Sequence, residues 1–153
     1  MYGTLLLLHS LLRWAVLLTG LLAVARAFSG WRSRRPWTLP DERIGFWFIT
    51  SLDLQFLLGL ILYLALSPLT RAAFQDFGAA MRDNVLRFWA VEHVFGMVLA
   101  IALAHIGRSR VHKTGDDARR HKLSLIFFTL ALILILGSIP WPTLPHGRPL
   151  VRW

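Results

Sequence analysis

Ionisable and metal-ligating side chains lie inside apolar stretches of this sequence, where lipid offers them no partner. A charge at the centre of a bilayer costs about 2.5–3.5 kcal/mol on insertion scales, so each such residue needs a partner or a function. Imidazoles can ligate a metal or carry protons, and paired charges can fix the register of helices. The residues concerned are His9, Arg13, Asp53, Glu92, His93 and His105, together with the polar but uncharged Gln55.

The composition is that of a membrane protein. The 153 residues are 56% hydrophobic and 16% charged, whereas a soluble domain carries about 25% charged residues. The absence of cysteine excludes a disulfide scaffold, a cysteine-ligated zinc site, an iron–sulfur cluster and a thiol nucleophile. The net charge of +9 comes from basic residues between the apolar stretches, where it indicates topology rather than nucleic-acid binding.

Four apolar stretches are long enough to cross a bilayer core of about 30 Å at 1.5 Å per residue. They cover residues 3–27, 44–66, 85–107 and 123–139. The short connections predict an all-α, integral membrane, antiparallel up-down-up-down four-helix bundle that forms one domain over residues 1–153. Hydrophobic residues at helical spacing within residues 70–86 predict a short outer surface helix or, alternatively, a folded cap over the bundle.

Basic residues set the expected orientation. Eleven lie in or beside the first and third connections, and five lie in the second connection and the C-terminal tail. Because basic residues favour the cytoplasmic side, we expect both termini outside. Tryptophans fit the same topology, with Trp31, Trp37 and Trp47 at the inner ends and Trp89, Trp141 and Trp153 at the outer interface.

His9 and His93 are expected at the same depth. Each follows the outer start of its helix by about six or seven residues, or roughly 9–11 Å. The two helices run in the same direction and lie diagonally in the bundle, so the imidazoles can ligate one haem iron from opposite sides. Small residues at Gly96, Ala100 and Ala104 would let a flat ligand come close. The alternative is that each histidine is a hydrogen-bonded packing residue.

Arg13 and Asp53 arrive at nearly the same level in the membrane, which predicts a buried ion pair with Gln55 nearby. Arg13 has the alternative role of holding a haem propionate or polarising a quinone carbonyl. Glu92 is level with the two histidines, where it can accept an imidazole N–H, pair with Arg13 or relay protons.

A second pair of histidines lies near the inner ends of the helices. His105 and His121 could ligate a second, inner haem. His121 lies within Arg119-Arg120-His121-Lys122, and this basic run is equally typical of an interface anchor.

Five segments together carry a resemblance to a known group of proteins. They are His9-Ser10-Leu11-Leu12-Arg13-Trp14, Asp53-Leu54-Gln55 followed by Gly59 and Tyr63, Glu92-His93 after Arg87-Phe88-Trp89, His105-Ile106-Gly107, and Ile139-Pro140-Trp141-Pro142. In this combination the sequence resembles short four-span bacterial membrane proteins labelled cytochrome b or cytochrome b-like. The resemblance implies a b-type haem protein of the bacterial inner (plasma) membrane, with His9 and His93 as its ligands. It does not extend to the paired, regularly spaced histidines of two-haem cytochromes b.

The sequence therefore predicts a b-type haem-binding electron-transfer subunit of a membrane redox complex, without stand-alone catalysis, that exchanges electrons with a quinone pool. Its expected partners are the lipid bilayer and other subunits of that complex, and not nucleic acid. One alternative is a haem-free structural or accessory subunit of a respiratory or photosynthetic membrane complex. Another is a small transporter or ion pathway, although no span has the mid-membrane Gly/Pro break typical of transporters.

Overall fold

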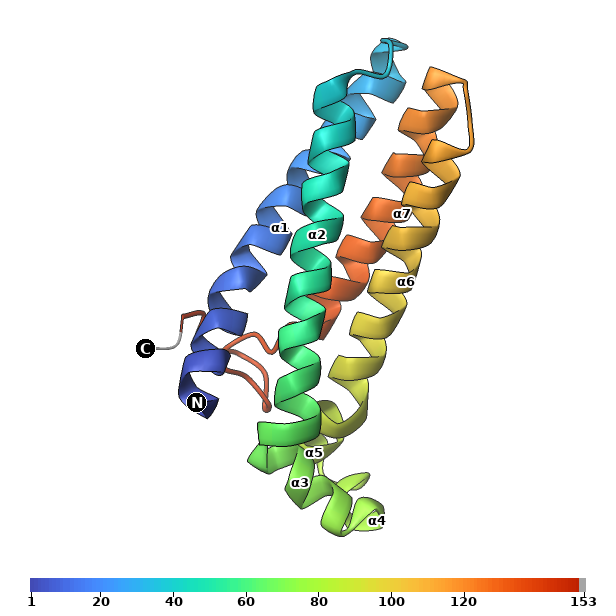
Figure 1. The fold of residues 1–153 in the computed structure, drawn as a ribbon. Helices are drawn as coiled ribbons and strands as arrows, with labels where there is room; N and C mark the ends of the chain where they lie inside the picture. Colours follow the sequence, from blue (N-terminus) through green and yellow to red (C-terminus); the bar gives the residue numbers. More distant parts are fainter. Residues whose placement is uncertain (152–153) are drawn as a thin grey trace.

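The computed structural model describes residues 1–151, and the predicted interface residue Trp153 lies outside the described residues. Within them the chain is all-helical, and four helical segments are long and apolar enough to cross a membrane (Figure 1). These segments are α1 Tyr2–Ser33, α2 Leu39–Ile61 with its π-helical continuation η1 Leu62–Leu66, α6 His93–His112 with the helical turns that precede it from Asn84, and α7 Asp117–Ser138.

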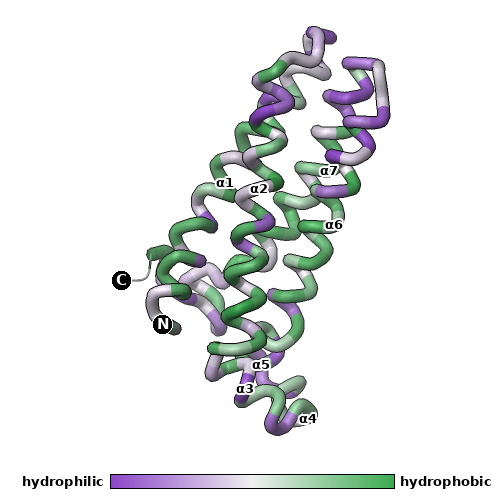
Figure 2. The backbone as a smooth tube through the Cα atoms, in the orientation of Figure 1, coloured by the Kyte–Doolittle hydropathy of each residue, from purple (hydrophilic) through white to green (hydrophobic). Residues whose placement is uncertain are grey.

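The helices extend past the predicted apolar stretches mainly at one end of the bundle, which we call the basic end. Here α1 continues to Ser33, α2 begins at Leu39, α6 continues to His112 and α7 begins at Asp117. Hydropathy marks the expected membrane boundary, whereas good helix formers such as Arg108, Arg110 and Arg119 carry α6 and α7 beyond it. Figure 2 shows the hydrophilic colours gathered at this end and hydrophobic colours along the helices below it.

Two short connections join the helices at the basic end. The first connection begins at Arg34, whose left-handed backbone (φ 51°) ends α1 and donates its N–H to the Gly30 carbonyl. α2 then begins with Thr38 as its N-cap, and the carboxylate of Asp41 accepts the Thr38 backbone N–H at 3.0 Å. The second connection ends at Asp116, which caps α7 by accepting the Arg119 N–H at 2.6 Å.

The helices pack around one core. α1 packs against α2 and α7, and α6 packs against α7 and α2, so that α1 and α6 lie across the bundle from each other (Figure 1). The rings of Phe48 and Phe128 meet edge to face at the centre, with centroids 5.2 Å apart. Ala100 and Ala104 of the predicted small-residue stripe are fully buried.

The other end of the bundle, which we call the cavity end, is more irregular. In place of one surface helix over residues 70–86, the chain forms α3 Pro68–Gln75, α4 Phe77–Ala80 and α5 Asn84–Arg87, followed by the π-helix η2 Phe88–Glu92. Asp76 and Asp83 each accept backbone N–H groups of a new helix start, which divides the predicted helix. Ala73, Ala80 and Ala90 form a small separate core, so the segment is folded on itself.

Candidate functional site

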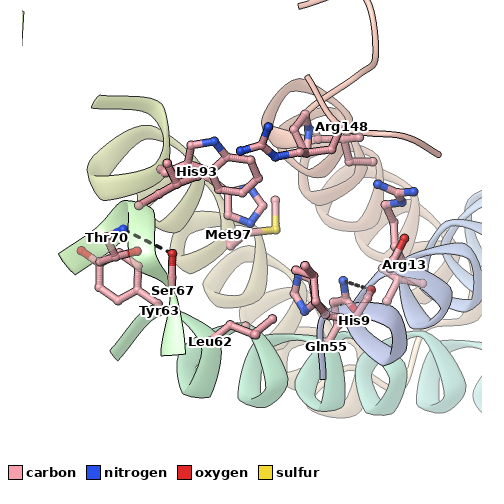
Figure 3. A pocket seen from close by; sticks show the side chains of 18 of the residues that line it. His9, Arg13, Gln55, Leu62, Tyr63, Ser67, Thr70, His93, Met97 and Arg148 are labelled. Atoms are coloured by element: carbon pink, nitrogen blue, oxygen red, sulfur yellow. Dashed lines mark hydrogen bonds between the residues drawn. The ribbon is translucent and has the colours of Figure 1, made fainter. Parts of the chain in front are cut away.

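A partly open cavity lies at the cavity end, between α1, α2 and α6. Its volume is about 140 Å³. η1, α3 and η2 contribute to its wall, and the segment after α7 covers one side. Figure 3 shows side chains of α1, α2 and α6 around this space, with His9 and His93 on different sides of it. Both π-helices border the cavity, and single π-turns of this kind are frequent at functional sites.

His93 is the first residue of α6, directly after η2. Its Nδ1 lies 2.7 Å from the backbone carbonyl oxygen of Ser138 at the end of α7. A carbonyl can only accept, so Nδ1 carries the proton and Nε2 keeps its lone pair. Metal-ligating histidines are typically oriented by such a bond from the other ring nitrogen. His93 is therefore held in the tautomer that a metal ligand requires.

His9 lies on α1 on the other side of the cavity, and its ring packs against Gly59 of α2. A Cβ added at Gly59 would lie 3.0 Å from the His9 Cε1 atom, so this glycine makes room for the imidazole. The His9 backbone carbonyl accepts the amide of Gln55 at 3.0 Å, which ties α1 to α2 at this level. The His9 Nδ1 is buried and has no partner among the described residues.

Two arginines that line the cavity come from opposite ends of the sequence. Arg13 of α1 donates to the Leu150 carbonyl, and the indole of Trp14 donates to the same oxygen at 3.3 Å. Arg148 lies over the Trp89 ring, with its guanidinium carbon 5.3 Å from the ring centroid. Residues 140–151, which we call the C-terminal strap, thus bridge α1 and η2 across the cavity wall.

Buried polar atoms without partners gather around this cavity. Five of the ten such atoms in residues 1–151 belong to residues that line it, and these are His9 Nδ1, Ser10 Oγ, Arg13 Nε, Gln55 Oε1 and Trp89 Nε1. More than nine in ten buried polar groups in proteins are hydrogen-bonded, because burying one alone costs free energy. Half of these atoms thus belong to residues that line one cavity, and small side-chain rotations would bring them to its surface.

The predicted Arg13–Asp53 ion pair is not formed. The Asp53 Oδ1 atom instead lies 2.7 Å from His105 Nε2, while Arg13 bonds to Leu150. Asp53 and Gln55 are two residues apart, which places them about 200° apart around α2. Since Gln55 faces α1 and His9, Asp53 faces α6 instead.

Glu92 does not take part in the cavity. Its carboxylate binds Arg87 at 2.7 Å, and its side chain is 47% exposed. The π-helix η2 adds a residue to the turn before His93, which turns Glu92 away from its expected place.

The predicted inner pair of His105 and His121 is not brought together either. His105 faces Asp53 on α2 and is half exposed. His121 is fully buried against Gly30 and Trp37, with ring centroids of Trp37 and His121 4.9 Å apart. The two imidazoles thus point at different neighbours, and a shared haem between them is not supported.

The basic end holds a polar cluster without a comparable cavity. The Asp41 carboxylate accepts hydrogen bonds from both terminal nitrogens of Arg35 at 2.6 Å and from the Nε of Arg26 at 3.0 Å. This hydrogen-bonded carboxylate raises the pKa of the Arg35 guanidinium above its ordinary value. These hydrogen bonds hold the first connection against α1, and both oxygens of the Asp41 carboxylate have partners.

Several residues of the cavity were not among the predicted site residues. Tyr63, Trp89, Met97 and Arg148 line it, and the Ser138 carbonyl orients His93. Ser51, Gln55 and Gly59 of α2 and Tyr63 of η1 follow one another at intervals of four residues, and this spacing was the available signal for Tyr63. Nothing in helical spacing indicates Arg148, because the strap folds back through irregular turns.

Comparisons with known proteins add no assignment. No protein-family model matches the chain, and neither a curated protein nor a solved structure matches it. Within the described residues no group of three or more His, Cys, Asp or Glu side chains is arranged to hold a metal ion.

Proposed function

We propose that the chain is a multi-pass protein of the bacterial plasma membrane, folded as an up-down-up-down bundle with both termini outside. Four long apolar helices and the concentration of arginine and lysine at the basic end support this proposal. A reporter that works only outside the cytoplasm should be active when it is fused to the C-terminus. Activity only of a cytoplasmic reporter at that position would reverse the orientation.

We further propose that the chain binds one haem b in the cavity and serves as an electron-transfer subunit of a membrane redox complex. The observation that carries the proposal is that His9 and His93, on two helices across the bundle from each other, line one cavity. Unpaired polar atoms around that cavity and the free Nε2 of His93 suit a ligand with a metal centre. When bound, haem supplies reversible one-electron chemistry.

The residues of this chain would hold and tune such a group. His93, oriented by the Ser138 carbonyl, and His9, seated on Gly59, would ligate the iron. Arg13 and Arg148 place guanidinium groups at the cavity wall, where they suit the carboxylates of propionate groups. The apolar part of the wall, which includes Leu52 and Ile135, excludes water and thereby affects the reduction potential.

Histidine variants test this proposal directly. His9→Ala and His93→Ala should each abolish the low-spin haem signal in a reduced-minus-oxidised spectrum of the purified protein. His105→Ala is the matched control, because His105 lies on α6 outside the cavity and should leave the signal intact. A signal that survives loss of His9 or His93, or that disappears with His105, would contradict the assigned ligands.

A haem-free structural or accessory subunit of a larger membrane complex is the second candidate. One observation favours it: His93 already makes a bond between α6 and α7, next to the contact of Gly96 with Ser138. On this alternative the cavity holds lipid or water, and the histidines only fix packing. Folded protein that purifies without a Soret band would support it.

A further inference from the structure

Asp53 and His105 form a hydrogen-bonded pair at a place where lipid would surround them on the proposed membrane topology. Their Oδ1 and Nε2 atoms are 2.7 Å apart, and their side chains are 40% and 51% exposed. Asp53 lies near the midpoint of the apolar segment Leu39–Leu66. Ionisable side chains at such depth cost free energy and usually serve a function, so we expect a ligand or a protein partner at this dyad.

The dyad has hydrogen-bonding capacity left over. Within residues 1–151 neither Asp53 Oδ2 nor His105 Nδ1 makes a hydrogen bond. A carboxylate oxygen accepts a hydrogen bond, and a ring nitrogen donates or accepts according to the tautomer. Exposed apolar residues flank the pair at helical spacing, and these are Leu57, four residues after Asp53 on α2, and Ala102, three residues before His105 on α6. The surroundings therefore suit an apolar molecule with a polar oxygen.

A seam of charged and titratable groups runs from the dyad toward the basic end. Glu42 Oε1 lies 2.7 Å from an Arg108 nitrogen and 3.3 Å from His112 Nε2. On α6, His105, Arg108 and His112 form one stripe. On α2, Glu42 and Asp53 belong to one stripe, with the apolar Phe46 and Ile49 between them. These stripes face each other where α2 and α6 meet, and these two helices pack less closely than α6 and α7.

We propose that the Asp53–His105 dyad binds the head group of a membrane-soluble quinone or hydroquinone, which enters from the lipid between α2 and α6. Such a ligand needs lateral access from the bilayer, hydrogen-bonding groups for its ring oxygens, and titratable groups that connect it with water. The exposed dyad provides the first two, and the seam through Glu42, Arg108 and His112 provides the third. A helix of a second copy or of another subunit could also cover the dyad. Such a helix would need only a polar side chain opposite the dyad, and neither access from the lipid nor a connection with water.

The site is separate from the cavity that we assign to haem, since neither dyad residue lines that cavity. Quinone binding therefore does not require bound haem. Protein that proves to be haem-free still tests the dyad, and a failure at the dyad leaves the haem proposal standing.

Photoaffinity labelling tests the proposal on the full chain in lipid nanodiscs. The probe is a benzoquinone with a short alkyl tail that carries an aryl azide, and labelled peptides are identified by mass spectrometry. Labels should fall on peptides with residues 49–57 or 98–106, and unlabelled decylubiquinone should compete for them. Asp53→Asn and His105→Ala should each weaken labelling about tenfold, as expected for loss of a charge-assisted hydrogen bond.

Glu92→Gln is the matched control, because it makes the same kind of change in an exposed ion pair at the cavity end and should leave the labelling unchanged. Circular dichroism shows whether each variant is folded, and the peptide map of the wild-type protein tests the site even if a variant is not. Labels on the cavity residues, labels that decylubiquinone does not displace, or equal labelling of the folded dyad variants would overturn the proposal. If chemical cross-linking in the nanodiscs joined the dyad residues of two copies, that result would overturn the proposal in favour of a dimer.

Discussion

Asp41 and Arg13 are both charged side chains that point between helices, but they lie at opposite ends of the bundle. The Asp41 carboxylate, only 2% exposed, takes hydrogen bonds from Arg26, Arg35 and Thr38. Arg13 has one carbonyl of the C-terminal strap as a hydrogen-bond partner, and its Nε is buried without one. The hydrogen bonds of the Asp41 carboxylate are thus complete, whereas those of the Arg13 guanidinium are not.

The difference shows which unpaired groups indicate a ligand. His121 at the basic end is also buried with both ring nitrogens unpartnered, yet it packs directly against Gly30 and Trp37. The unpaired atoms of His9 and Arg13 instead belong to residues beside an open volume. An orphaned polar atom indicates a ligand only when space for that ligand lies next to it.

The largest effect is expected from Asp41→Asn at the basic end. Removing one partner of a buried ion pair costs about 3–5 kcal/mol, and we expect the lower value because both arginines are partly exposed. Thermal and denaturant unfolding in micelles measures the loss. Glu92→Gln, which breaks the exposed pair with Arg87, should cost less than about 1 kcal/mol. Equal losses in the two variants would remove the contrast between the two ends.

Two glycine substitutions compare the same change at the two ends. At Gly30 an added Cβ would overlap the His121 ring, which Trp37 covers, so Gly30→Ala should cost about 1–3 kcal/mol of unfolding free energy. At Gly59 the Cβ would meet the His9 Cε1 at 3.0 Å, and that ring can turn into the cavity. Gly59→Ala should therefore cost less than about 1 kcal/mol, partly offset by better helix propensity. A larger loss at Gly59 than at Gly30 would show that the cavity end is the rigid one.

Long-range patterns in the sequence predicted the coarse fold, and local exceptions escaped them. Hydropathy marks four long helices because each must present apolar side chains over many turns. The breaks at Asp76 and Asp83 depend on single side-chain caps, which compete with the helical spacing of their neighbours. The π-turn before His93 rotates Glu92 away, and residue counting along an ideal helix cannot detect such a turn.

Within the site, the faces of the helices were predictable and the contacts between helices were not. The stripe through Gln55 and Gly59 faces the cavity as helical spacing implies, and Asp53 lies off that stripe. Matching Arg13 with Asp53 by depth alone ignored this angle, which explains the wrong pair. His9 and His93 share the cavity because both lie near helix starts at one end of the bundle.

The smallest effect is expected from Ser10→Ala at the cavity end. Ser10 Oγ is buried without a partner, so its removal should change the unfolding free energy of ligand-free protein by less than about 0.5 kcal/mol. Ser67→Ala is the matched control, since Ser67 accepts the Thr70 N–H at the start of α3 and its loss should cost about 1 kcal/mol. If Ser10→Ala proves the more costly of the two, its hydroxyl has a partner and the cavity wall is complete without a ligand.

The haem content of the purified wild-type protein tests the assignment of the cavity most directly. A pyridine haemochrome measurement, set against the protein concentration, should give one haem b per chain when the protein is made in haem-replete cells. Folded protein that contains no haem, and that takes up none when haem is added, would contradict the assignment and favour the accessory subunit.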